Sequence, residues 1–104
     1  MNPEYTVIMA ARASTELREI SDYIATESPR NALLMVERIV ASLKSLRTFP
    51  HRTLVEDLQR RYSPPVRSLP VSPYVVFFLV FDDRRIVMVV RIVHGSRKRP
   101  NRFE

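Results

Sequence analysis

The chain has 104 residues and carries 17 lysines and arginines against 11 aspartates and glutamates, a formal net charge of +6. This length suits a single domain (residues 1–104) with a modest core, and 45% apolar residues exclude a disordered chain. There is no cysteine and one glycine, which excludes disulfides, thiolate metal sites and glycine-rich phosphate loops. We therefore expect one domain that holds neither a metal nor a cofactor.

The first half of the chain predicts a strand followed by two helices. Apolar and β-branched residues predict the strand over Tyr5–Ala10. Apolar residues spaced three and four apart predict a helix over Ala13–Glu27. Ser28 is a good helix cap and Pro29 suits a first helical position, so a second helix should run from Pro29 to about Arg47. Its apolar stripe indicates a helical hairpin packed on a sheet rather than a free coiled coil.

The second half predicts three strands: Val66–Val71, Tyr74–Phe81 and Arg85–His94. Residues 51–65 before them read as a loop with one turn of helix at Val55–Arg61. Short turns join the three strands, which predicts an antiparallel meander. The fold class is therefore α+β: an N-terminal strand, a helical hairpin and a three-stranded antiparallel meander in one sheet. The helices would cover one face, leaving the other face open for function.

Alternation along the last strand predicts which of its residues share a face. Arg91 then lies within an apolar face, where a charge needs a partner or an open groove. One face would carry Val87, Val89, Arg91 and Val93, and the other would carry Ile86, Met88, Val90, Ile92 and His94.

Positive charge is concentrated in the second half, where residues 53–104 carry ten positive and five negative side chains. The densest part begins at Arg91 and continues into a polar, basic tail over residues 95–104. Such a surface suits a polyanionic partner, either nucleic acid or an acidic protein. A solvated tail without a partner is the alternative.

His94 has two possible roles. The free imidazole titrates near neutrality, so His94 could act as a general acid–base. Alternatively, it is a strand-end residue hydrogen-bonded to the backbone. Arg67 would project near His94 if the strand register places it there. The pairs of neighbouring carboxylates are more typical of loops than of a catalytic dyad.

Several segments together carry a resemblance to a known family. They are Ala13–Tyr23, Leu-Arg-Thr-Phe-Pro at 46–50, Val-Arg-Ser-Leu-Pro-Val at 66–71, the apolar Tyr74–Phe81, and Arg-Ile-Val-His-Gly-Ser-Arg at 91–97. In this order they resemble the ParE branch of the RelE/ParE toxin superfamily, the toxins of bacterial type II toxin–antitoxin modules. The resemblance covers nearly the whole chain and implies a helical hairpin on an antiparallel sheet.

The resemblance also implies partners. A small cognate antitoxin, ParD-like and with a ribbon-helix-helix DNA-binding part, would wrap the toxin through an acidic segment. DNA would be reached only through the antitoxin or the target, and no membrane contact is expected. With neither a signal peptide nor an apolar span in the sequence, the expected location is the cytoplasm. The expected antitoxin-binding residues are Tyr23, Leu33, Val40 and Tyr74.

Two activities occur in this superfamily. ParE-like members inhibit DNA gyrase without catalysis of their own, and RelE-like members cleave mRNA on the ribosome. RelE-like members place a tyrosine soon after the last strand, where this chain has Pro100 and Phe103. That departure favours gyrase inhibition, so we expect an inhibitor without catalysis of its own. A protein that binds its antitoxin but has lost toxicity is a third alternative.

The two activities imply different site residues. An inhibitor would contact its target through the basic end of the chain: Arg91, His94, Arg97, Lys98 and Arg99. An RNase would stabilise phosphate charge with arginines and move a proton with a histidine, and the candidates are Arg67, Arg91, Arg97 and His94.

Overall fold

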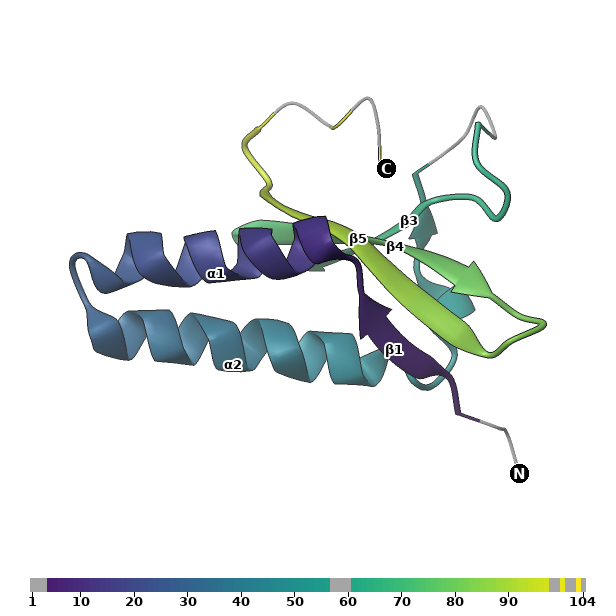
Figure 1. The fold of residues 1–104 in the computed structure, drawn as a ribbon, viewed down its shortest axis with the longest axis horizontal. Helices are drawn as coiled ribbons and strands as arrows, with labels where there is room; N and C mark the ends of the chain where they lie inside the picture. Colours follow the sequence, from purple (N-terminus) through teal and green to yellow (C-terminus); the bar gives the residue numbers. More distant parts are fainter. Residues whose placement is uncertain (1–3, 57–60, 98–99, 101–102, 104) are drawn as a thin grey trace.

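The computed structural model describes residues 4–56, 61–97, 100 and 103. A helical hairpin lies beside one face of a twisted sheet, and the outer end of the hairpin extends past the sheet (Figure 1). The elements are β1 (Thr6–Met9), α1 (Ala11–Ala25), α2 (Pro29–Ser45), the short 3₁₀ helix η1 (Pro50–Arg52), β2 (Leu54–Val55), β3 (Arg67–Val71), β4 (Tyr74–Phe81) and β5 (Ile86–His94).

The sheet has five strands in the order β1-β5-β4-β3-β2. Strands β3, β4 and β5 form the predicted antiparallel meander. Strand β1 joins the edge of the sheet and runs parallel to β5, a pairing that needs a long connection between the two strands. The α+β fold class is confirmed, with one strand more than predicted.

The extra strand is β2, which replaces part of the predicted helical turn at 55–61. Val55 pairs with Arg67 at the edge of β3, so the helical prediction is wrong at this residue. The β-branched side chain of valine suits a strand better than a helix. Residues 57–60 of that prediction lie outside the described part of the chain.

The start of the second helix is confirmed. The Oγ of Ser28 accepts a hydrogen bond from the backbone N–H of Asn31 at 3.1 Å, and Pro29 follows as the first helical residue. The first helix begins at Ala11, two residues earlier than predicted, because Ala11 and Arg12 are good helix formers. None of the helices in the described ranges is long and apolar enough to cross a membrane.

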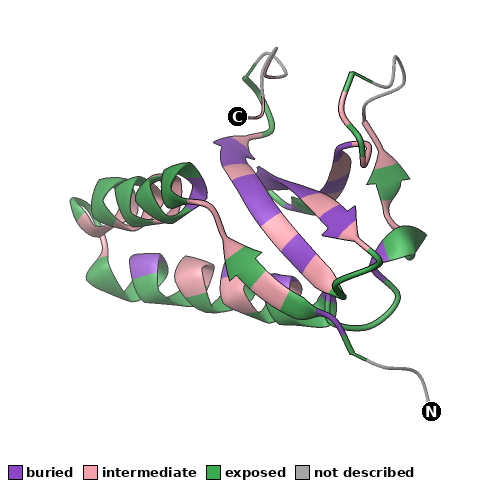
Figure 2. Cartoon of the chain, turned by 45° about the vertical axis from the view of Figure 1, so that its right-hand side comes forward, coloured by how far each residue is buried: buried purple, intermediate pink, exposed green. Residues whose placement is uncertain are grey.

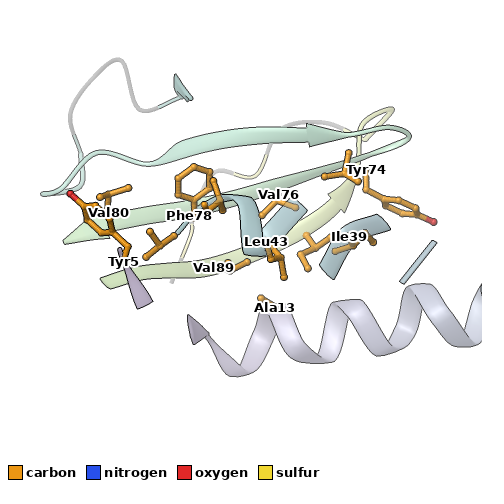
Figure 3. Packing of buried hydrophobic residues seen from close by; sticks show 13 residues of the cluster. Tyr5, Ala13, Ile39, Leu43, Tyr74, Val76, Phe78, Val80 and Val89 are labelled. Carbon is orange, nitrogen blue, oxygen red and sulfur yellow. The ribbon is translucent and has the colours of Figure 1, made fainter. Parts of the chain in front are cut away.

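The main core lies between the helical hairpin and the sheet. Strands β4 and β5 contain most of the buried residues, whereas the outer sides of both helices are exposed (Figure 2). Figure 3 shows side chains from α2 and from strands β4 and β5 meeting in this layer. Its fully buried members include Ile39, Leu46, Val76, Phe78, Val87 and Val89.

A β-bulge in β5 changes which residues share a face. Phe77 pairs with Arg91 and Phe78 pairs with Val89, so Val90 has no partner on β4. One extra residue shifts the alternation by one position. Ile92 therefore joins the helix-side core, and the predicted alternation is wrong beyond the bulge. Val90 and Val93 belong to the opposite face.

The opposite face is not open, contrary to the prediction. A second buried cluster covers it, centred on Phe77 and Val90. The ring of Phe103 lies 5.0 Å from that of Phe77 and 5.9 Å from that of Tyr62, between centroids. The backbone N–H of Phe103 also donates to the Tyr62 hydroxyl at 3.1 Å. Phe103 thus packs on this face of the sheet, where its apolar ring is partly buried.

Candidate functional site

A groove of about 460 Å³ lies between α1 and the end of β5. We call it the His94 groove. It brings together residues predicted for two different roles: Tyr23 and Tyr74 for the antitoxin, and His94 and Arg97 for the target. Glu16, Glu19 and Ile20 of α1 complete the facing wall.

His94 sits at the last position of β5, opposite Tyr74 on β4. The two rings meet edge to face with centroids 5.4 Å apart. The His94 Nδ1 accepts the backbone N–H of Ser96 at 3.1 Å and lies 2.8 Å from the Ser96 Oγ. Within the described residues, no carboxylate hydrogen-bonds this ring. The structure therefore shows the backbone-bonded histidine that the sequence left as an alternative.

Arg91 has a partner on α1. Its guanidinium binds both carboxylate oxygens of Glu16, with Nε at 3.0 and 3.1 Å and Nη2 at 2.9 Å. The same carboxylate accepts the backbone N–H of Ile92 at 3.0 Å. The two side chains are only 12% and 16% exposed. The expectation of a partner is confirmed, and this pairing neutralises the charge of Arg91 within the fold.

Arg67 does not lie near His94, so that expectation is wrong. Arg67 pairs with Phe78, whereas His94 lies at the opposite end of the sheet beside Tyr74. The Nη1 of Arg67 donates to the carbonyls of His51 and Thr53 at 3.1 and 2.9 Å. The register of β3 against β4 decides this placement.

The other residues expected to contact the target follow β5 in the sequence. Arg97 is exposed, and its backbone N–H donates to the His94 carbonyl at 3.1 Å. Gly95 closes this turn by donating its N–H to the Pro73 carbonyl at 2.7 Å, an approach with little room for a larger residue. Lys98 and Arg99 lie outside the described residues.

The residues expected to bind the antitoxin occupy different environments. Tyr23 is 78% exposed and Leu33 is 59% exposed, near the outer end of the helical hairpin. Val40 is half-buried on α2, and Tyr74 is buried at the base of the His94 groove. Exposed apolar side chains of this size suit a surface that a partner covers.

A hydrogen-bonded network at the other end of the molecule was missed by sequence reasoning. The Oδ1 of Asp82 accepts the Tyr5 hydroxyl at 2.5 Å and the His51 Nε2 at 2.6 Å. The hydrogen bond from Tyr5, followed by that from His51, lowers the pKa of Asp82. The bond to Asp82 also raises the pKa of Tyr5. No motif could have revealed this network, because its members are far apart in the sequence.

The lowered pKa of Asp82 predicts a pH effect on stability. A carboxylate whose pKa is lower in the folded state stabilises the fold above its unfolded value of about 3.9, and this contribution is lost at lower pH. We expect the melting temperature of the wild type to fall more steeply below about pH 4 than that of Asp82→Asn. Melting curves from about pH 2 to 6 test this. Asp83→Asn is the matched control and should follow the wild type; identical slopes for Asp82→Asn would contradict the prediction.

The family model described as the ParE toxin of type II toxin–antitoxin system, parDE, matches residues 7–99. The chain belongs to this ParE toxin family. The resemblance to the ParE branch of the superfamily is therefore confirmed. No curated protein sequence matches the chain.

Solved structures share the fold of this ParE family member. A chain of the chromosomal ParDE system from P. aeruginosa has a TM-score of 0.70 and 23% identity, covering 89% of this chain and 98% of its own. The RelBE2 toxin–antitoxin complex from Mycobacterium tuberculosis gives a TM-score of 0.58 at 22% identity, covering 88% and 98%. A mutant of the E. coli toxin RelE in the free state gives 0.58 at 20% identity, covering 89% and 85%.

Proposed function

We propose that this ParE family toxin inhibits DNA gyrase and is neutralised by a cognate antitoxin. Gyrase inhibition is favoured over mRNA cleavage by one observation: the four RNase candidates do not gather at one place. Arg91 is paired with Glu16, and Arg67 holds two carbonyls at the far end of the sheet. Of the four, His94 and Arg97 remain at the His94 groove.

RNA cleavage requires three functions in one place. A base must activate the 2′-hydroxyl, a cation must stabilise the phosphorane, and an acid must protonate the leaving oxygen. The four predicted residues do not assemble this set. A binding surface makes no such demand, since an inhibitor needs only a shape and charge that fit its target.

The His94 groove and the nearby exposed Tyr23 support antitoxin binding at this side of the molecule. Tyr23 and Tyr74 offer aromatic surface for a helical or extended segment. The +6 charge of the chain would speed its encounter with an acidic segment. The ParDE and RelBE2 neighbours bear the names of toxin–antitoxin pairs, which agrees with such a partner. An antitoxin of the ParD type would then cover groove residues that the target also uses.

Gyrase supercoiling assays test the target. The full chain at stoichiometric amounts should block supercoiling, and His94→Ala/Arg97→Ala should require about tenfold more protein, or about 1.4 kcal/mol of binding. Arg38→Ala removes an exposed arginine of α2 and should match the wild type. Melting curves confirm that the variants fold.

Three outcomes would overturn the proposal. Unchanged supercoiling at stoichiometric excess would exclude gyrase as the target. Cleavage of mRNA on translating ribosomes would instead indicate a RelE-like RNase. The absence of growth arrest when the chain is expressed alone would indicate a non-toxic antitoxin-binding protein.

A further inference from the structure

A second groove, of about 660 Å³, lies at the end of the molecule opposite the His94 groove. We call it the Phe49 groove. The start of β1, the turn after α2 and the β4–β5 turn lie on this same side (Figure 1). Its walls include Tyr5, Arg47, Phe49, His51, Arg52 and Arg85.

Two residues of this groove have unusual backbone conformations. Phe49 has φ of 48° and Arg85 has φ of 54°. Over the described ranges these are the two non-glycine residues in the left-handed region, and both line the Phe49 groove. Phe49 is also 63% exposed, so burial of its ring does not offset the strain. Strained residues that gather at one place indicate a function there.

The turn that presents Phe49 is held rigidly by two arginines. Arg52 donates from Nη1 to the carbonyls of Thr48 and Phe49 at 2.8 and 3.0 Å. Its Nη2 donates to the Ser45 Oγ at 3.0 Å. On the other side, Arg67 binds the carbonyls of His51 and Thr53. The backbone that carries the exposed ring is therefore fixed, which lowers the entropic cost of binding.

The groove is also rich in positive charge. In the described part of the chain, none of Arg47, Arg52 and Arg85 lies within salt-bridge distance of a carboxylate. The Arg85 guanidinium lies over the Tyr5 ring, 5.4 Å from its centroid, and attracts the Asp82 carboxylate electrostatically. Two carboxylates are near: Glu4 lines one wall, and Asp82 is hydrogen-bonded to Tyr5 and His51.

We propose that the Phe49 groove binds single-stranded nucleic acid. A base would stack on the exposed ring of Phe49, and the flanking phosphates would contact Arg47 and Arg85. An acidic peptide could use the arginines, but it would give no role to an exposed aromatic ring held in a strained conformation. The proposal does not depend on the target of the toxin, and it adds a direct nucleic-acid contact to those made through an antitoxin or gyrase.

Fluorescence anisotropy with a labelled oligothymidylate of about twelve nucleotides tests the proposal on the full chain at low salt. Phe49→Leu keeps an apolar side chain but removes the ring, and we expect it to weaken binding by about tenfold. Arg47→Ala and Arg85→Ala should each lower the slope of log affinity against log salt concentration by about 0.7.

Matched controls separate this site from general attraction to a basic protein. Leu54→Ala alters another exposed apolar residue nearby, and Arg38→Ala removes an exposed arginine of α2; both should bind as the wild type does. His94→Ala/Arg97→Ala should also retain oligonucleotide binding while losing potency against gyrase, so the two proposals can fail separately. Three results would overturn this one: absent binding, equal affinity of Phe49→Leu and the wild type, or equally tight binding of a polyglutamate peptide.

Discussion

Replacing Arg91 by alanine should destabilise the fold by about 3 kcal/mol, one of the two largest effects that we expect. The change leaves the Glu16 carboxylate largely buried, at 16% exposure, without its cationic partner. Glu16→Ala should cost at least as much, because the backbone N–H of Ile92 also loses its acceptor. Urea unfolding followed by circular dichroism measures both losses.

A nearby exposed residue and a double variant serve as controls for this pair. Glu19→Ala removes an exposed carboxylate from the same helix and should change stability by less than about 0.5 kcal/mol. Glu16→Leu/Arg91→Met should recover most of the loss, since apolar side chains of similar volume can replace a buried ion pair. Losses below about 1 kcal/mol for both single variants would mean that the ion pair is solvent-screened and contributes little.

The second large effect concerns the two adjacent phenylalanines of β4. Phe77 and Phe78 are both fully buried, but they point into different clusters on opposite faces of the sheet. We expect Phe77→Ala and Phe78→Ala each to cost about 3–5 kcal/mol, because each leaves a cavity in a packed layer. The free energy of unfolding in urea gives both values.

The comparison tests whether the face opposite the helices is a true core. Phe81→Ala, at a half-buried position at the end of the same strand, should cost less than either change. Phe103→Ala should weaken the second cluster in part, since its ring rests on Phe77 and Tyr62. A cost below about 1 kcal/mol for Phe77→Ala would show that this face is open, as the sequence alone had predicted.

Local patterns in the sequence were sufficient for the fold class and the family. The cap formed by Ser28 and Pro29, the apolar stripe of α2 and the long apolar run Tyr74–Phe81 each predict an element within a short window. The segment Arg-Ile-Val-His-Gly-Ser-Arg at 91–97, together with the other matching segments, resembles the ParE branch, and the family match over residues 7–99 agrees.

The candidate site could be predicted only in part. The sequence indicated His94 and Arg97 near each other, and they do line one groove. It could not show that Arg91 is paired with Glu16, which lies 75 positions away along the chain. Nor could it show that Arg67 stabilises the turn at His51 instead of approaching His94.

By itself, the sequence determined the order of the two helices and of four of the five strands, the α+β class and the family, because these depend on periodicity and short motifs. The tertiary structure decided which side chains meet. The extra residue Val90 moves Ile92 to the helix side, and Phe103 packs on the opposite face. Tyr5, His51 and Asp82 come together from three distant segments. The physical reason is that strand register, bulges and long-range hydrogen bonds depend on the packing of the whole chain, which no local pattern encodes.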